Sequence, residues 1–165
     1  MLESTWRHEA DSDVLKKGER IGQIVGVVMT VLVALFLLSH WTGDTGFYTS
    51  EFNGWDALVL FAPLLYGIVP SSYRALIGRK NVVRPVDILG MMLFVISAAY
   101  FLCSFHFDMQ FFADPLPEWL RFIIDWIDEG WAKLFLALGI IGGTAGIGWT
   151  ILAYLKVKEL LSQST

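Results

Sequence analysis

Two histidines are the residues of this chain whose type and position best suit chemistry. His40 lies in LSHW at the end of one long apolar run, and His106 lies in SFHFD at the end of another. If both runs are helices pointing the same way, the two imidazoles lie at similar depth. Such a pair could bind a b-type haem, or a metal ion together with Asp44, Glu51 or Asp108.

The alternative is that both histidines hydrogen-bond to lipid headgroups or to these neighbouring acids. Nearby carboxylates favour the charged imidazole, which does not ligate a metal. We therefore expect no cofactor, with haem b as the alternative.

Other catalytic patterns are missing from the sequence. It contains no hydrolase nucleophile constellation, no phosphate-binding loop and no Cys–His metal spacing. A single cysteine, Cys103, cannot form an internal disulfide. The net charge is −4, and no basic patch with interleaved aromatic residues occurs. We expect a protein that is not an enzyme and does not bind nucleic acid.

Long apolar segments must position these residues. The chain has 165 residues, 55% hydrophobic and 17% charged, whereas a soluble domain carries about 25% charged residues. A helix crosses a bilayer with about 20 apolar residues, and four segments reach that length: 21–41, 55–73, 86–105 and 132–155. The sequence thus predicts an all-α integral membrane protein, a four-transmembrane-helix bundle over residues 21–156, flanked by cytoplasmic segments 1–20 and 157–165.

The basic residues predict the orientation of these spans. Ten of the twelve lysines and arginines lie in the N-terminal segment, in the loop between spans two and three, or in the C-terminal tail. The positive-inside rule places both termini in the cytoplasm. We expect the membrane to be a plasma membrane or a bacterial inner membrane. The basic residues of the inner loop could also bind anionic lipid headgroups, although setting the topology is a sufficient role. They are Arg74, Arg79, Lys80 and Arg84.

Residues 117–130 form an amphipathic pattern between spans three and four. The charged residues fall within an arc of about 100° on a helical wheel. A helix of this length is only about 21 Å long, too short to cross a hydrocarbon core of about 30 Å. We expect an interfacial helix lying on the outer surface as an anchor, or alternatively a docking surface for a basic partner. The anchoring side chains would be Trp119, Phe122, Ile123 and Trp126.

Glycines four residues apart occur in the first and fourth spans. Small residues at this spacing allow a second helix backbone to approach closely. We expect spans one and four to pack together within the chain, or alternatively an interface with other chains or a groove for a lipid tail. The residues are Gly22, Gly26, Gly139, Gly142, Gly143 and Gly146.

These features favour a non-catalytic accessory or structural subunit of a larger membrane complex, with lipids and other membrane subunits, or further copies of itself, as partners. An alternative is a small oligomeric transporter or channel, because Pro63 and Pro70 should kink the second span. A third is a haem-carrying electron-transfer subunit. In size and topology the chain resembles the small four-span membrane subunits of tripartite solute transporters; no shared motif accompanies this resemblance, and it assigns no residue a role.

Overall fold

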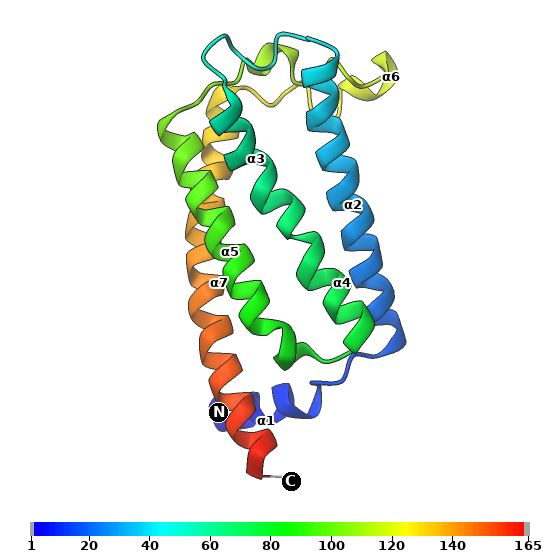
Figure 1. Cartoon of the computed structure of the whole chain (residues 1–165), viewed down its shortest axis with the longest axis vertical. Coiled ribbons are helices and arrows are strands. Elements are labelled where there is room, and N and C mark those ends of the chain that lie inside the picture. The colour runs from blue at the N-terminus through cyan, green and yellow to red at the C-terminus, as the bar shows by residue number, and fades with distance from the viewer. Residues whose placement is uncertain (1, 164–165) are drawn as a thin grey trace.

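Helices make up about three quarters of the protein. The computed structural model describes residues 2–163, and these contain no β-strand. Four helical stretches are long and apolar enough to cross a membrane, which confirms the all-helical class and the presence of four such helices. They are α2 (Lys17–Thr42), α3 (Gly54–Tyr66) continued by α4 (Ile68–Ile77), α5 (Lys80–Cys103) and α7 (Glu129–Gln163). In Figure 1 they run roughly along the long axis of the molecule.

The second stretch is interrupted at Gly67, between α3 and α4. Proline has no backbone N–H, so Pro70 cannot donate the helical hydrogen bond to the carbonyl of Tyr66. Pro63 lies inside α3 and removes another such bond. The two prolines therefore weaken the helix on both sides of Gly67, which is where the sequence predicts a kink.

The third stretch begins at Lys80, six residues before the predicted start of the span. Asp13 explains the early start, because it satisfies two N–H groups at the beginning of α5. Its carboxylate accepts a hydrogen bond from the backbone N–H of Asn81 at 2.7 Å, and its carbonyl accepts one from Lys80 at 2.9 Å. Helix N-termini leave such N–H groups without a partner in the helix itself.

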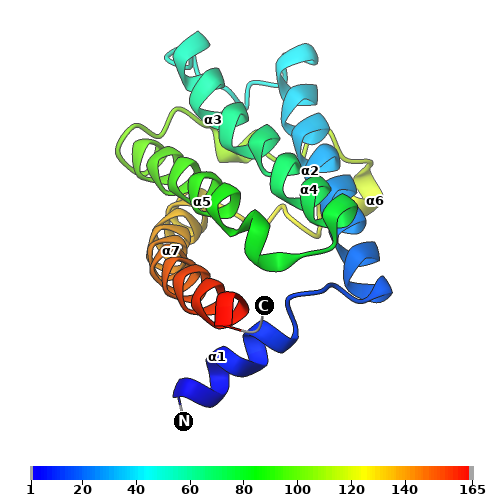
Figure 2. The same ribbon diagram turned by 60° about the horizontal axis from the view of Figure 1, so that its bottom comes forward.

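The helices pack in two groups. α5 packs along α7, while α2 packs against α4 and α3, and α3 and α4 also contact α5. A further helix, α1 (Leu2–Asp11), crosses the end of the molecule beside α7 (Figure 2). Buried apolar side chains gather at the two ends of the molecule, whereas large apolar side chains along the helices are exposed. At the α1 end they are Leu15, Val83, Ala153 and Val157, and at the opposite end Phe47, Ala98, Phe101 and Ala113.

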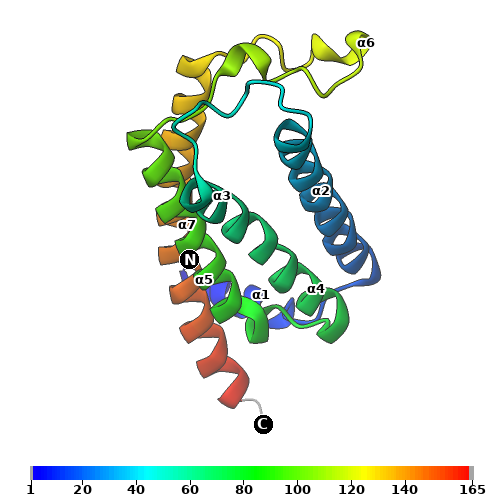
Figure 3. The same cartoon turned by 45° about the horizontal axis from the view of Figure 1, so that its top comes forward.

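The segment between α5 and α7 covers the end opposite to α1. It contains a short 3₁₀ helix η1 (Met109–Phe111) and a single turn α6 (Glu118–Arg121). Figure 3 shows this segment crossing from α5 to the end of α2, where α6 lies, before it returns to α7. The expectation of one continuous interfacial helix over 117–130 is therefore wrong.

Two polar side chains explain why that helix does not form. Arg121 turns back and donates hydrogen bonds to the carbonyls of Asp114 and Leu116, at 3.0 and 3.1 Å. Asp128 accepts the backbone N–H of Trp131 at 3.0 Å and so caps the start of α7. The chain thus ends one helix and begins another inside the amphipathic segment.

Candidate functional site

His40 is buried in an aromatic cluster at the end of α2. Its side chain is 1% exposed, and its ring lies 4.3 Å from the ring of Phe47 and 5.1 Å from that of Phe36. Nδ1 lies 2.7 Å from the hydroxyl of Thr45. Nε2 is buried and has no hydrogen-bond partner in the described part of the chain. One ring nitrogen of His40 therefore has a hydrogen-bond partner and the other has none among the described residues.

His106 follows α5 and belongs to a cluster of carboxylates. Its Nδ1 lies 3.4 Å from Asp56, and its Nε2 lies 3.5 Å from Glu51. Asp56 is fully buried at the start of α3. It accepts hydrogen bonds from the hydroxyl of Tyr100 at 2.6 Å and from the backbone N–H of Asn53 at 2.8 Å.

The structure thus places the two histidines in different side-chain clusters at the same end of the molecule. Within residues 2–163 no group of three or more histidine, cysteine or acidic side chains is placed to hold a metal ion. A metal site with Asp44, Glu51 or Asp108 therefore has no geometric support among these residues. Haem ligation by His40 and His106 stays a prediction.

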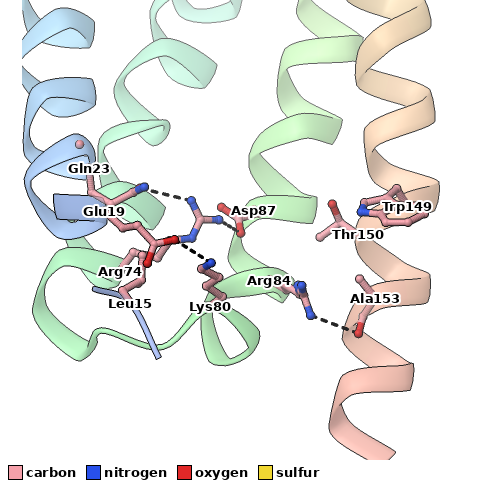
Figure 4. A pocket seen from close by; sticks show the side chains of 11 residues that line it. Leu15, Glu19, Gln23, Arg74, Lys80, Arg84, Asp87, Trp149, Thr150 and Ala153 are labelled. Atoms are coloured by element: carbon pink, nitrogen blue, oxygen red, sulfur yellow. Dashed lines mark hydrogen bonds and ion pairs between the residues drawn. The ribbon is translucent and has the colours of Figure 1, made fainter. Parts of the chain in front are cut away.

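An open pocket of about 570 Å³ lies at the opposite end of the molecule, and we call it the basal pocket. Figure 4 shows side chains from α2, α4, α5 and α7 meeting around it. It combines three basic and two acidic side chains with apolar walls. The lining residues are Leu15, Glu19, Gly22, Gln23, Arg74, Lys80, Arg84, Asp87, Trp149, Thr150 and Ala153.

Ion pairs join the helices around this pocket. Arg74 on α4 pairs with Asp87 on α5 and also donates to the side-chain oxygen of Gln23 on α2, at 3.3 Å. Lys80 at the start of α5 pairs with Glu19 on α2, at 2.9 Å. The two ion pairs link α4 and α2 to the start of α5, and the Arg74–Gln23 bond links α4 to α2, so the network holds together the ends of three helices.

Arg84 is the most buried basic residue of the network, with 8% of its surface exposed. Its guanidinium pairs with Glu9 of α1 and donates to Asn81 on α5 at 2.8 Å. A third hydrogen bond, of 3.2 Å, goes to the carbonyl of Ala153 on α7. Arg84 therefore joins three helices to one another and uses three of its five N–H donors.

Sequence reasoning missed this polar network. It treated the four basic residues as one exposed loop, because it started the third span at residue 86. Arg74, Lys80 and Arg84 instead line the basal pocket, whereas Arg79 is exposed and does not line it. Their binding of lipid headgroups stays a prediction.

The glycines of the fourth span pack against α5. A side chain at Gly139, Gly143 or Gly146 would meet Phe94, Val95 or Met91 of α5 at 3.2 Å or less. The expectation that spans one and four pack together is wrong, because α7 packs on α5 and α2 packs on α4. A Cβ atom would meet nothing within 4 Å at the remaining three glycines, which are Gly22, Gly26 and Gly142.

The four predicted anchors remain exposed although their helix does not form. Trp119, Phe122, Ile123 and Trp126 each expose half or more of their surface. Trp126 also packs edge-on against Trp131 at the start of α7, with 5.6 Å between ring centroids. Their insertion into a membrane interface is a prediction that these exposures permit.

The chain matches no known protein family, no curated protein and no solved structure.

Proposed function

We propose that the protein is a non-catalytic subunit of a larger membrane complex, and that α2 holds it to a helix of another chain. The observation that carries this proposal is the open pair of glycines on α2. Gly22 and Gly26 lie one helical turn apart, and neither has an atom of the chain within 4 Å of the position of a Cβ.

α2 uses only a narrow stripe of its surface within the chain. Apart from Phe36, its half-buried residues recur every three or four positions, as expected for one face of a helix. Gly22 and Gly26 lie outside that stripe, and so do the large apolar residues on the rest of the helix. From the start of α2 to residue 37 the half-buried residues are Arg20, Gln23, Val27, Thr30, Ala34, Phe36 and Leu37.

Glycine at this spacing favours a helix as the neighbour more than it favours lipid. Acyl chains adapt to any apolar surface, so a lipid-facing helix has no need of a flat groove. A second helix does, because close approach of two backbones is what stabilises helix pairs in a membrane. In this chain the other glycine groove, at Gly139 and Gly143, is filled by α5.

The proposal commits to a membrane helix of a different chain as the partner. Most of the large exposed apolar side chains lie on the four long helices, which hold about two thirds of the described residues. Such a surface suits a membrane helix better than a water-soluble partner. A second copy of the same chain is an alternative outcome of the experiment below.

Native purification in mild detergent, followed by mass spectrometry, tests the proposal. We expect an unrelated membrane protein to copurify with the wild-type chain and to be lost from Gly26→Leu. Val28→Phe is the matched control. Residue 28 lies about 200° around the helix from residue 26, so the larger side chain lies on a different face of α2. A chain that purifies alone, or that loses its partner equally in both variants, would contradict the proposal.

The interrupted second span supports a second candidate, a small oligomeric transporter or channel. An open pocket of about 370 Å³ lies beside the interruption, lined by Pro63, Gly67 and Pro70 together with the Arg74–Asp87 ion pair. Interrupted helices line substrate pathways in many transporters. A homogeneous homo-oligomer that conducts ions or solutes in liposomes would favour this candidate over the subunit.

A further inference from the structure

We propose that the basal pocket binds the phosphate group of an anionic phospholipid, and that Arg74 and Lys80 contact it. The pocket shares Gly22 with the helix face of the proposed subunit contact. The lipid site itself requires only that the ends of the helices meet a lipid headgroup layer. The argument has three parts: charge, unused hydrogen-bond donors and position.

Basic side chains outnumber acids in the lining of the pocket. Three basic side chains, Arg74, Lys80 and Arg84, line it together with two acids, Glu19 and Asp87. The lining carries a net charge of +1 when all five are ionised, and Glu9, which pairs with Arg84 from outside the lining, balances this charge. Arg74 and Lys80 are each about a quarter exposed, so solvent screens them less than it screens fully exposed basic residues.

All three basic residues have unused hydrogen-bond donors, but Arg84 is buried and already makes three hydrogen bonds. A guanidinium carries five N–H donors and an ammonium carries three. In the described part of the chain, Arg74 contacts Gln23 and Asp87, while Lys80 contacts Glu19. Arg84 is bound by α1, α5 and α7 and serves to hold the wall of the pocket. Arg74 and Lys80 are thus the groups that can receive phosphate oxygens.

The position of the pocket favours a lipid over a phosphate ion from water. Gly22 of α2 lines it on one side, and Trp149 and Ala153 of α7 line it on another. α2 and α7 do not pack along each other in the described chain, so the pocket opens between two apolar helices. A phospholipid can place its phosphate among the basic side chains while its acyl chains follow this opening.

Trp149 also fits a headgroup level. Its indole is half exposed and packs against Trp6 of α1, with 5.1 Å between ring centroids. Tryptophan concentrates where the acyl chains of a bilayer meet the headgroups. α1 crosses the same end of the molecule (Figure 2), and its Glu9 pairs with Arg84 of the pocket lining.

Lipid titration of the detergent-purified full chain tests the proposal, with native mass spectrometry as the readout. We expect phosphatidylglycerol to remain bound and phosphatidylcholine to dissociate. Lys80→Gln should weaken phosphatidylglycerol binding about fivefold, since one basic residue near a lipid surface contributes about 1 kcal/mol. Lys80→Arg should retain binding.

Arg79→Gln is the matched control for this titration. Residue 79 precedes Lys80, carries the same charge and is exposed outside the pocket. Its substitution should leave binding unchanged within about twofold. Equal loss in Arg79→Gln and Lys80→Gln would overturn the proposal in favour of diffuse surface attraction. Displacement of phosphatidylglycerol by millimolar inorganic phosphate would show that the phosphate group need not come from a lipid. Equal retention of phosphatidylglycerol and phosphatidylcholine would overturn the site itself.

Discussion

Tyr100 donates a hydrogen bond to Asp56 across 2.6 Å, and this bond joins the last turn of α5 to the first turn of α3. Asp56 also accepts the backbone N–H of Asn53, so the same carboxylate caps its own helix and fastens it to the next. A buried carboxylate needs such partners, since a charge without them is costly to bury. The pair therefore holds the end of the bundle opposite to α1.

Substitution of Tyr100 by phenylalanine should lower the thermal unfolding midpoint by roughly 5 °C, because a hydrogen bond to a buried charged group is lost. Tyr66→Phe is the control, since Tyr66 donates only to the neutral carbonyl of Val86, at 3.3 Å. Its midpoint should fall by less. Equal shifts, measured by circular dichroism in detergent, would contradict a special role for the Tyr100–Asp56 pair.

Substitution of Glu9 by glutamine should loosen α1 from the bundle. Glu9 is the carboxylate that pairs with the buried Arg84 and so joins α1 to α5 and α7. We expect backbone amides of α1 to exchange with deuterium about tenfold faster, since an ion-paired hydrogen bond stabilises by about 1.5–3 kcal/mol. Asp11→Asn removes the same charge from an exposed position of α1 and should leave the exchange rates unchanged.

Substitution by alanine should change the free energy of unfolding differently at two adjacent glycines of α7. A Cβ at Gly143 would lie 2.6 Å from Val95, whereas one at Gly142 would meet nothing within 4 Å. Gly143→Ala should therefore cost about 1–3 kcal/mol of unfolding free energy through overpacking. Gly142→Ala should not lower it. Reversible unfolding in mixed micelles measures both, and a similar loss in the two variants would contradict the α5–α7 contact.

His40→Phe tests whether the buried imidazole has a ligand in the native protein. In the absence of one, phenylalanine removes a buried nitrogen without a partner and joins the surrounding aromatic rings. Removing the desolvation cost of Nε2 should raise the free energy of unfolding by about 1–3 kcal/mol, and losing the bond to Thr45 should lower it by about 1 kcal/mol. The free energy of unfolding should therefore rise slightly. A large fall in stability, together with Soret absorption in the wild-type protein, would instead support haem ligation.

Spin labels can locate the segment that lacks the expected helix. In a Cys103→Ser background, a label at residue 122 should be accessible to oxygen, because Phe122 is exposed among apolar neighbours and should lie in the bilayer interface. A label at the exposed residue Asp125 should instead be accessible to a water-soluble nickel complex. Identical profiles at both positions would contradict membrane anchoring by this segment.

The four apolar helices could be predicted from the sequence because hydrophobicity and length are local properties. Each run of about 20 apolar residues specifies a helix whatever lies beside it. The interruption of the second stretch is equally local, since Pro63 and Pro70 remove backbone donors wherever the helix packs. For the same reason the sequence could show that His40 and His106 end two long apolar runs.

Only the tertiary structure decided which surfaces meet. Asp13 caps α5 from 68 residues away in the chain, and Arg84 joins three helices, because long-range contacts depend on chain geometry that no local pattern encodes. The segment 117–130 has the period of an amphipathic helix, but hydrogen bonds of Arg121 and Asp128 divide it. Glycine spacing likewise marks a helix that can be approached closely, while the packing of α7 on α5 determines which glycines are filled and leaves those of α2 open.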